Sequence, residues 1–115
     1  MGNSRVAIMS DIHGNLQALE AVFRDIDRQK VDEVYCLGDV VGYGLKPREV
    51  TDSVREKIGS EICIMVNHDR VVAIDDPTSR ELLLAFSNIA EIGAEWTRQQ
   101  LSDDQKDFLR YLKYT

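Results

Sequence analysis

The sequence predicts an α/β domain in which a parallel βαβαβ layer is followed by two helices. Three short apolar runs, residues 5–9, 33–37 and 61–65, are separated by two amphipathic stretches. Apolar runs of this length that alternate with amphipathic segments favour parallel strands joined by right-handed helical crossovers. The chain has 115 residues and no internal repeat, so it has room for one domain.

The first crossover helix is expected over residues 15–29. Its apolar side chains recur at helical spacing while its charged side chains lie elsewhere, as in a helix that packs on one face of a sheet. The apolar positions are Leu16, Leu19, Phe23 and Ile26. Pro47 opens a second helix at about residues 48–57, because proline is favoured in the first turn of a helix.

The remainder of the chain is predicted to be helical. Two segments, residues 78–81 and 102–105, match the capping box that starts many helices. They predict one helix from about Ser79 to Gln100 and a shorter helix from about Asp103 to Leu112.

The composition limits the classes of partner. A formal net charge of -6 disfavours an extended nucleic-acid surface, which relies on clustered lysine and arginine. No apolar stretch approaches the ~20 residues of a membrane span. Cys36 and Cys63 lie in apolar strand-like runs without a nearby second cysteine, which is typical of buried thiols in a reducing compartment. We therefore expect a cytoplasmic protein without a membrane partner.

Polar clusters follow each of the three predicted strands. Asp11 and His13 come after the first, Asp39 after the second, and Asn67 and His68 after the third. In a parallel sheet the carboxyl ends of the strands lie at one edge, so these side chains can converge on a divalent metal. The alternative is that they only cap helices and form turns.

Taken together, the motifs Asp11-Ile12-His13, Gly38-Asp39-Val40-Val41-Gly42 and Asn67-His68-Asp69 resemble those of the calcineurin-like metallophosphoesterases. The flanking residues look like the small prokaryotic branch of that family, which includes phosphodiesterases and relatives of diadenosine tetraphosphatase. The resemblance covers effectively the whole chain and implies a metal-dependent phosphoesterase acting on a phosphomonoester or phosphodiester.

The resemblance also implies roles for individual residues. Asp11 and His13 would bind one metal, Asp39 would bridge two metals, and Asn67 would bind the second through its carbonyl oxygen. Two such cations can activate a shared hydroxide and clamp the phosphoryl oxygens. Mn²⁺, Fe, Zn²⁺ and Ni²⁺ all tolerate this mixed ligation.

The same resemblance assigns catalytic roles to the third motif. His68 would stabilise charge on the phosphoryl group or protonate the leaving oxygen, and Asp69 would orient its imidazole. Val66 stands where the family normally has glycine. Val66 either strains a position that needs a positive backbone angle or merely extends the third strand.

Family members supply further histidines from later G-H and G-H-x-H motifs, which this sequence does not contain. The family fold is a four-layer αββα sandwich, and residues 1–115 correspond to its N-terminal half. The sheet face that would meet the second sheet should be apolar and exposed, which predicts a homo-oligomer. Without those histidines we expect the phosphoesterase activity to be impaired. The alternative is a non-catalytic, self-associating half-domain that binds at most one metal tightly.

Overall fold

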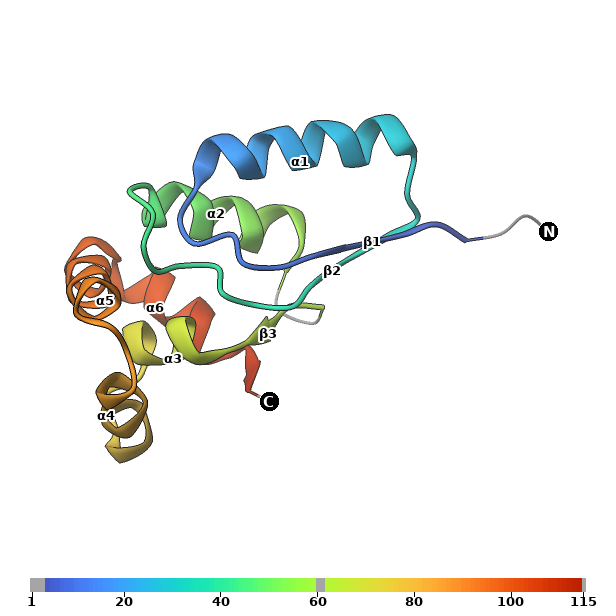
Figure 1. The fold of residues 1–115 in the computed structure, drawn as a ribbon. Coiled ribbons are helices and arrows are strands. Elements are labelled where there is room, and N and C mark those ends of the chain that lie inside the picture. The colour runs from blue at the N-terminus through green and yellow to red at the C-terminus, as the bar shows by residue number, and fades with distance from the viewer. Residues whose placement is uncertain (1–3, 60–61, 115) are drawn as a thin grey trace.

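A computed structural model describes residues 4–59 and 62–114 (Figure 1). Strands and helices alternate in the first half of the chain, and helices dominate the second half. In order, the elements are β1 (Val6–Met9), α1 (Leu16–Gln29), β2 (Glu33–Cys36), α2 (Pro47–Lys57), β3 (Ile64–Met65), α3 (Asn67–Ala73), α4 (Pro77–Leu84), α5 (Asn88–Gln100), α6 (Asp103–Arg110) and β4 (Lys113–Tyr114). The prediction of an α/β fold with parallel strands is confirmed.

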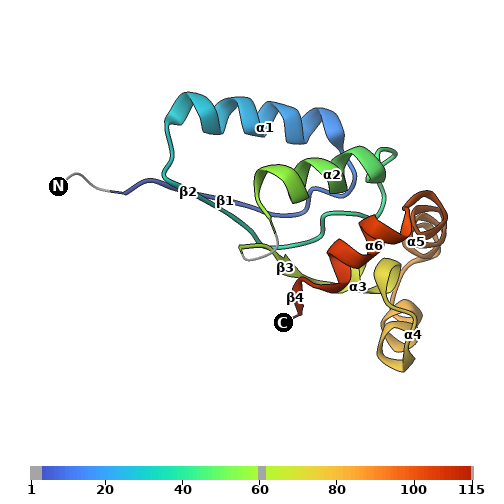
Figure 2. The same ribbon diagram turned by 180° about the vertical axis from the view of Figure 1, so that it is seen from behind.

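The strands form a short parallel layer. β1 and β2 pair in parallel from Val6 opposite Glu33 to Met9 opposite Cys36. On the other side of β2 the backbone of Cys63 forms an isolated parallel β-bridge with that of Cys36, and the Cys36 amide donates to the carbonyl of Ile62 at 2.9 Å. The third strand is shorter than expected, and Glu61 lies outside the described residues. β4 was not predicted; it pairs in parallel with β3 near the C-terminus (Figure 2).

Helices α1 and α2 lie on one side of β1 and β2 (Figures 1 and 2). The predicted apolar stripe of α1 faces inward, with Leu19 and Phe23 buried. The Asn15 side chain caps this helix by accepting a hydrogen bond from the Ala18 amide at 3.1 Å, as asparagine does at many helix N-termini. The Asn15 cap therefore fixes the end of the turn at which α1 begins.

The single helix expected from Ser79 to Gln100 is wrong. α4 ends at Leu84, and α5 begins after Ser87, whose hydroxyl accepts a hydrogen bond from the Ala90 amide at 3.2 Å. Serine at this position offers the backbone a helix start that competes with continuation of the preceding helix. The first cap is also different from the predicted one, because Asp76 accepts from the Ser79 amide at 2.8 Å.

The second predicted capping box is present. Ser102 and Gln105 each accept a hydrogen bond from the other's backbone amide, at 3.2 and 2.9 Å, and α6 follows. None of the helices within residues 4–59 and 62–114 has the length and apolar content needed to cross a bilayer.

The sheet face away from α1 and α2 carries exposed apolar side chains, as the resemblance implied. Alternate residues of a strand point to one face, and on this face Val6, Ile8, Tyr35 and Leu37 are 47%, 67%, 36% and 47% exposed. The opposite face holds buried residues such as Met9 and Cys36. The core thus lies on the helix side of the layer only.

Candidate metal centre

The loops that follow β1 and β2 are bonded to each other through their backbones. The amides of Asp11, His13 and Gly14 donate to the carbonyls of Gly38, Asp39 and Val40 at 3.0, 2.8 and 2.9 Å. This ladder continues the parallel pairing beyond the strands. It brings the first two predicted motifs to one edge of the sheet, as expected.

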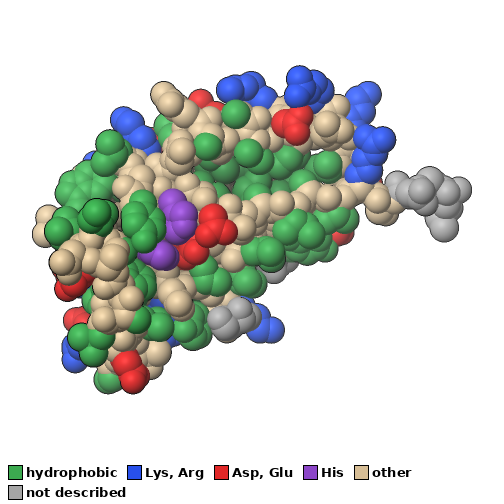
Figure 3. Space-filling view, in the orientation of Figure 1, with side chains coloured by type: hydrophobic (Ala, Val, Ile, Leu, Met, Phe, Trp, Pro, Cys, Tyr) green, Lys and Arg blue, Asp and Glu red, His purple; other side chains and the backbone are tan. Residues whose placement is uncertain are grey.

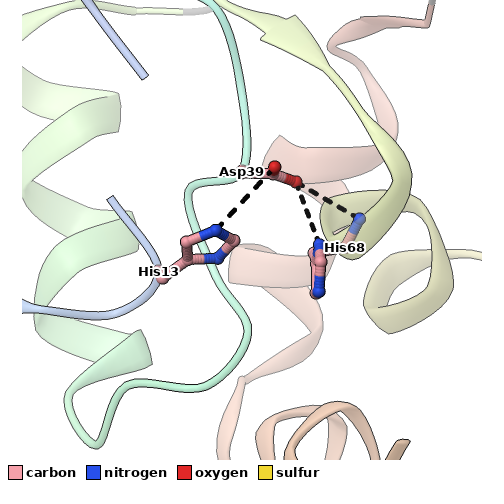
Figure 4. Close-up of side chains that lie close together, drawn as sticks. All are labelled: His13, Asp39 and His68. Carbon is pink, nitrogen blue, oxygen red and sulfur yellow. Dashed lines mark hydrogen bonds and ion pairs between the residues drawn. The ribbon is translucent and has the colours of Figure 1, made fainter. Parts of the chain in front are cut away.

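Asp39 lies between the two histidines of the chain (Figure 4). One carboxylate oxygen is 3.8 Å from His13 Nε2, and the other is 3.3 Å from His68 Nδ1. Donor atoms of His13, Asp39 and His68 all lie within 4.8 Å of one another. Asp11 extends this group, because its Oδ1 lies 3.4 Å from His13 Nε2.

The hydrogen bond on the far side of the His13 ring sets which nitrogen faces the carboxylates. His13 Nδ1 lies 3.1 Å from the carbonyl oxygen of Val41, which can only accept, so Nδ1 carries a proton. In the neutral ring Nε2 then presents a lone pair toward two carboxylates. Metal-bound histidines are commonly oriented by such a second hydrogen bond. A cation between the His13 Nε2 atom and the carboxylates of Asp11 and Asp39 would interact favourably with all three groups, so the residues fit a divalent metal.

Asp39 is held in its ionised form. Burial acts to raise its pKa, but the hydrogen bond and charge of His68, together with the charge of His13, outweigh burial and keep the pKa of Asp39 below its ordinary value. Only an ionised carboxylate has both oxygens free to accept or to bind cations.

Three of the predicted ligands have left-handed backbones. The φ angles of Asp11, His13 and Asp39 are 56°, 49° and 53°. Non-glycine residues adopt this region at a cost and do so most often at functional sites. The conformation turns the chain sharply just after β1 and β2, and the side chains project from the sheet edge.

Asn67 and His68 form the first turn of α3 rather than a loop. Asn67 is exposed, whereas the ring of His68 is packed against its neighbours. A Cβ added at Gly42 would lie 2.8 Å from His68 Cδ2, so only glycine fits beside the ring. The Nε2 atom of His68 is buried and has no hydrogen-bond partner among the described residues.

Asp69 does not lie where a residue that orients the His68 ring would lie. It is fully buried, and its carboxylate accepts hydrogen bonds from the amides of Asp39, Val41 and Val66 at 2.8, 3.1 and 3.4 Å. The carboxylate in contact with His68 is that of Asp39 instead. Asp69 therefore joins the loop after β2 to the start of α3, and it acts on the site by holding Asp39 in place.

Val66 does not adopt a positive backbone angle. Its φ and ψ angles are −124° and −170°, an extended conformation open to any residue. Its side-chain methyl groups would lie 2.9 and 3.1 Å from a Cβ added at Gly38. Of the two alternatives for this position, the structure supports simple extension of the chain from β3.

Two aromatic residues of the site were not predicted. Tyr43 lies 5.3 Å from the His13 ring and 5.1 Å from the His68 ring, and Phe86 lies 4.7 Å from His68. Tyr43 stands between two glycines in the sequence, which marks a tight turn but not its destination. Phe86 falls inside the single helix expected from Ser79 to Gln100, and it reaches the site because that helix breaks.

A family model for calcineurin-like phosphoesterases matches residues 4–113. The chain belongs to the calcineurin-like phosphoesterase family. The sequence is also 35% identical over 109 residues to an uncharacterized protein of Methanocaldococcus jannaschii, covering 95% of this chain and 42% of that protein. The crystal structure of a metallophosphoesterase from Sphaerobacter thermophilus superposes with a TM-score of 0.72 and 36% identity, over 96% of this chain and 42% of that one.

This calcineurin-like phosphoesterase chain thus spans well under half the length of the two relatives. Membership of the family implies divalent metal ions. Within the part of the chain that the structure describes, His13, Asp39 and His68 form a cluster whose ligand atoms could hold one.

Proposed function

We propose that this protein binds one or two divalent metal ions at the candidate centre and hydrolyses phosphoesters. The observation that carries the proposal is the placement of Asp39 between two imidazoles, with His13 Nε2 turned toward two carboxylates. Asp11, His13 and Asp39 would hold a first ion, and Asp39 and Asn67 a second. Bound ions would supply Lewis-acid activation of the phosphoryl group.

The protein's own residues would orient the substrate and move a proton. His68 lies with its ring 4.9 Å from that of His13, close to where a phosphoryl group would meet the ions. We assign to it the stabilisation of charge on the phosphoryl oxygens or protonation of the leaving oxygen. Asp39 fixes its orientation through Nδ1, and Asp69 fixes Asp39.

The types of ligand and the metal ions available to the protein would decide which metal binds. Imidazole and carboxylate ligands accept Mn²⁺, Fe, Zn²⁺ and Ni²⁺. Because Asn67 is exposed and the proposed second site has two protein ligands, Asp39 and Asn67, we expect that site to be the weaker one.

Hydrolysis of two chromogenic esters tests the proposal. The expected result is Mn²⁺-dependent release of p-nitrophenol from p-nitrophenyl phosphate or its bis ester, abolished by a chelator and restored by excess Mn²⁺. The Asp39→Asn variant should show only background release, while Asp103→Asn, which changes an exposed carboxylate on α6, should behave like the unaltered protein. Equal rates for the unaltered protein and Asp39→Asn would contradict the enzyme proposal.

A second candidate function is that of a non-catalytic half-domain acting through self-association. The exposed face of β1 and β2 favours it, since Ile8 and Val6 leave apolar area in water that a second copy would cover. In this case calorimetry should find at most one tight metal site, and neither chromogenic ester should be hydrolysed.

Self-association has its own measurement. We expect light scattering to give at least a dimer, and Ile8→Lys to shift it toward monomer by placing a charge on the apolar face. Leu84→Lys is the matched control, because Leu84 is 86% exposed on α4, away from the strands (Figure 1). If the unaltered protein is a monodisperse monomer, the proposal of self-association is wrong.

We also propose a cytoplasmic location. Cys36, at the end of β2, and Cys63, just before β3, are buried thiols that form no disulfide. Unbridged cysteine pairs are typical of reducing compartments.

A further inference from the structure

A cavity of about 650 Å³ opens beside the metal centre. Its lining includes the metal-facing residues Asp11 and His13, together with Asn15, Tyr43, Leu45 and Lys46. Volumes of this size are typical of sites for small organic ligands. Because the cavity shares two walls with the metal centre, a group esterified to a phosphoryl unit at that centre would extend into it.

Tyr43 lines this cavity on a strained backbone. Its φ angle is 63°, which costs free energy for a residue other than glycine. The following glycine is required, since a Cβ at Gly44 would come within 1.9 Å of the His13 carbonyl oxygen. Helix α5 also packs close to Tyr43, since a Cβ added at Gly93 would lie 3.5 Å from the Tyr43 amide nitrogen.

The Tyr43 side chain is left half exposed by this arrangement. Its ring lies 5.3 Å from the His13 ring and 5.1 Å from the His68 ring, yet the residue remains 50% exposed. In Figure 3 hydrophobic side chains lie directly beside the two histidines at the surface. A strained backbone that presents a half-exposed aromatic ring next to metal ligands indicates contact with a ligand.

The chemistry of the walls indicates an aromatic or otherwise apolar organic group. Tyr43 and Leu45, the latter 77% exposed, offer apolar contact area. Lys46 is the cation among the lining residues, and its ammonium group already lies 3.5 Å from a carboxylate oxygen of Glu49. Asp11 adds a negative charge to the same lining, so the charged lining side chains offer a second anionic group on the ligand no net positive charge.

We infer that this cavity binds the esterified organic group of the substrate and that Tyr43 contacts it, so that the site prefers aryl over small alkyl phosphoesters. The inference rests on the proposed function, since it takes the phosphoryl group to lie at the metal centre. Tyr43 is then a specificity-determining residue, distinct from the residues that hold the ions.

Binding of two non-hydrolysable probes tests the inference on the Mn²⁺-loaded 115-residue protein. Calorimetry should show phenylphosphonate binding about two- to tenfold more tightly than methylphosphonate, the range expected from one aromatic contact. Tyr43→Phe should keep this preference. Tyr43→Asn should lose it while binding methylphosphonate as before, because asparagine tolerates a left-handed backbone. Tyr111→Asn, on an 81% exposed tyrosine after α6, is the control and should change neither affinity.

The outcomes separate the two proposals. Equal affinity of the unaltered protein for both phosphonates would overturn the preference while leaving the phosphoryl site in place. Loss of both affinities and of Mn²⁺ binding in Tyr43→Asn would show a merely structural role and would also overturn the inference. If Mn²⁺ binds but neither phosphonate does, the proposed phosphoesterase function fails, and the inference fails with it.

Discussion

Asp39→Asn is expected to weaken Mn²⁺ affinity by on the order of 100-fold or more. Even residues that only orient metal ligands change affinity by about 10- to 100-fold, and Asp39 contacts both histidines directly. The substitution keeps the shape of the side chain but replaces one carboxylate oxygen with an NH₂ group that repels a cation. Asparagine also tolerates the left-handed backbone of this position, so the fold should survive.

Isothermal titration with Mn²⁺ measures this effect, with circular dichroism to confirm that the variant is folded. Asp103→Asn serves again as the control for loss of one negative charge. Unchanged affinity in a folded Asp39→Asn protein would mean that the ions bind elsewhere.

Asp69→Ala is expected to lower the free energy of unfolding by about 3 to 5 kcal/mol. The change leaves the amides of Asp39 and Val41 without their acceptor, and each unsatisfied buried group costs about 1 to 3 kcal/mol. It also opens a cavity where a fully buried side chain stood. Urea unfolding monitored at Trp96 measures the loss, and a change below about 1 kcal/mol would contradict the anchoring role.

The same residue gives the stability a pH dependence in metal-free protein. Burial raises the pKa of Asp69 from its ordinary value of 3.8 to about 7, although three backbone amides act to lower it. Between these two values the folded state holds a proton that the unfolded state has released, so stability falls as the pH rises. Asp69→Asn cannot titrate. With a chelator present, the unaltered protein should lose stability relative to this variant from pH 4 to pH 8; parallel profiles would contradict the raised pKa.

Much of the fold follows from local sequence patterns. The apolar stripe of α1 and the proline of α2 place those helices to within a residue or two of their observed bounds. The break after α4 was missed because Ser87 follows the helix-forming run from Leu82 to Ala85, whereas its side chain caps a new helix through the Ala90 amide. β4 was missed because a two-residue strand has no periodicity and depends on pairing with β3.

The site was predictable where topology decides it and less so where packing does. Parallel strands bring Asp11, His13, Asp39 and His68 to one edge of the sheet. This convergence could be predicted from the order of the strands and motifs alone. The contacts of Asp69 depend on the direction of the first turn of α3, which the motif alone does not specify. Tyr43 and Phe86 join the site through a turn and a helix break, whose destinations in the fold the local sequence does not specify.

The left-handed backbones at Asp11, His13, Asp39 and Tyr43 carry a consequence for the history of this chain. Glycine would occupy such positions at lower free energy, so folding alone gives the bulkier side chains no advantage. Random substitution under pressure for stability would erode them, as happens where activity and robustness compete. The presence of all four at one site indicates that selection has acted on what these side chains do, at some expense to the scaffold that presents them.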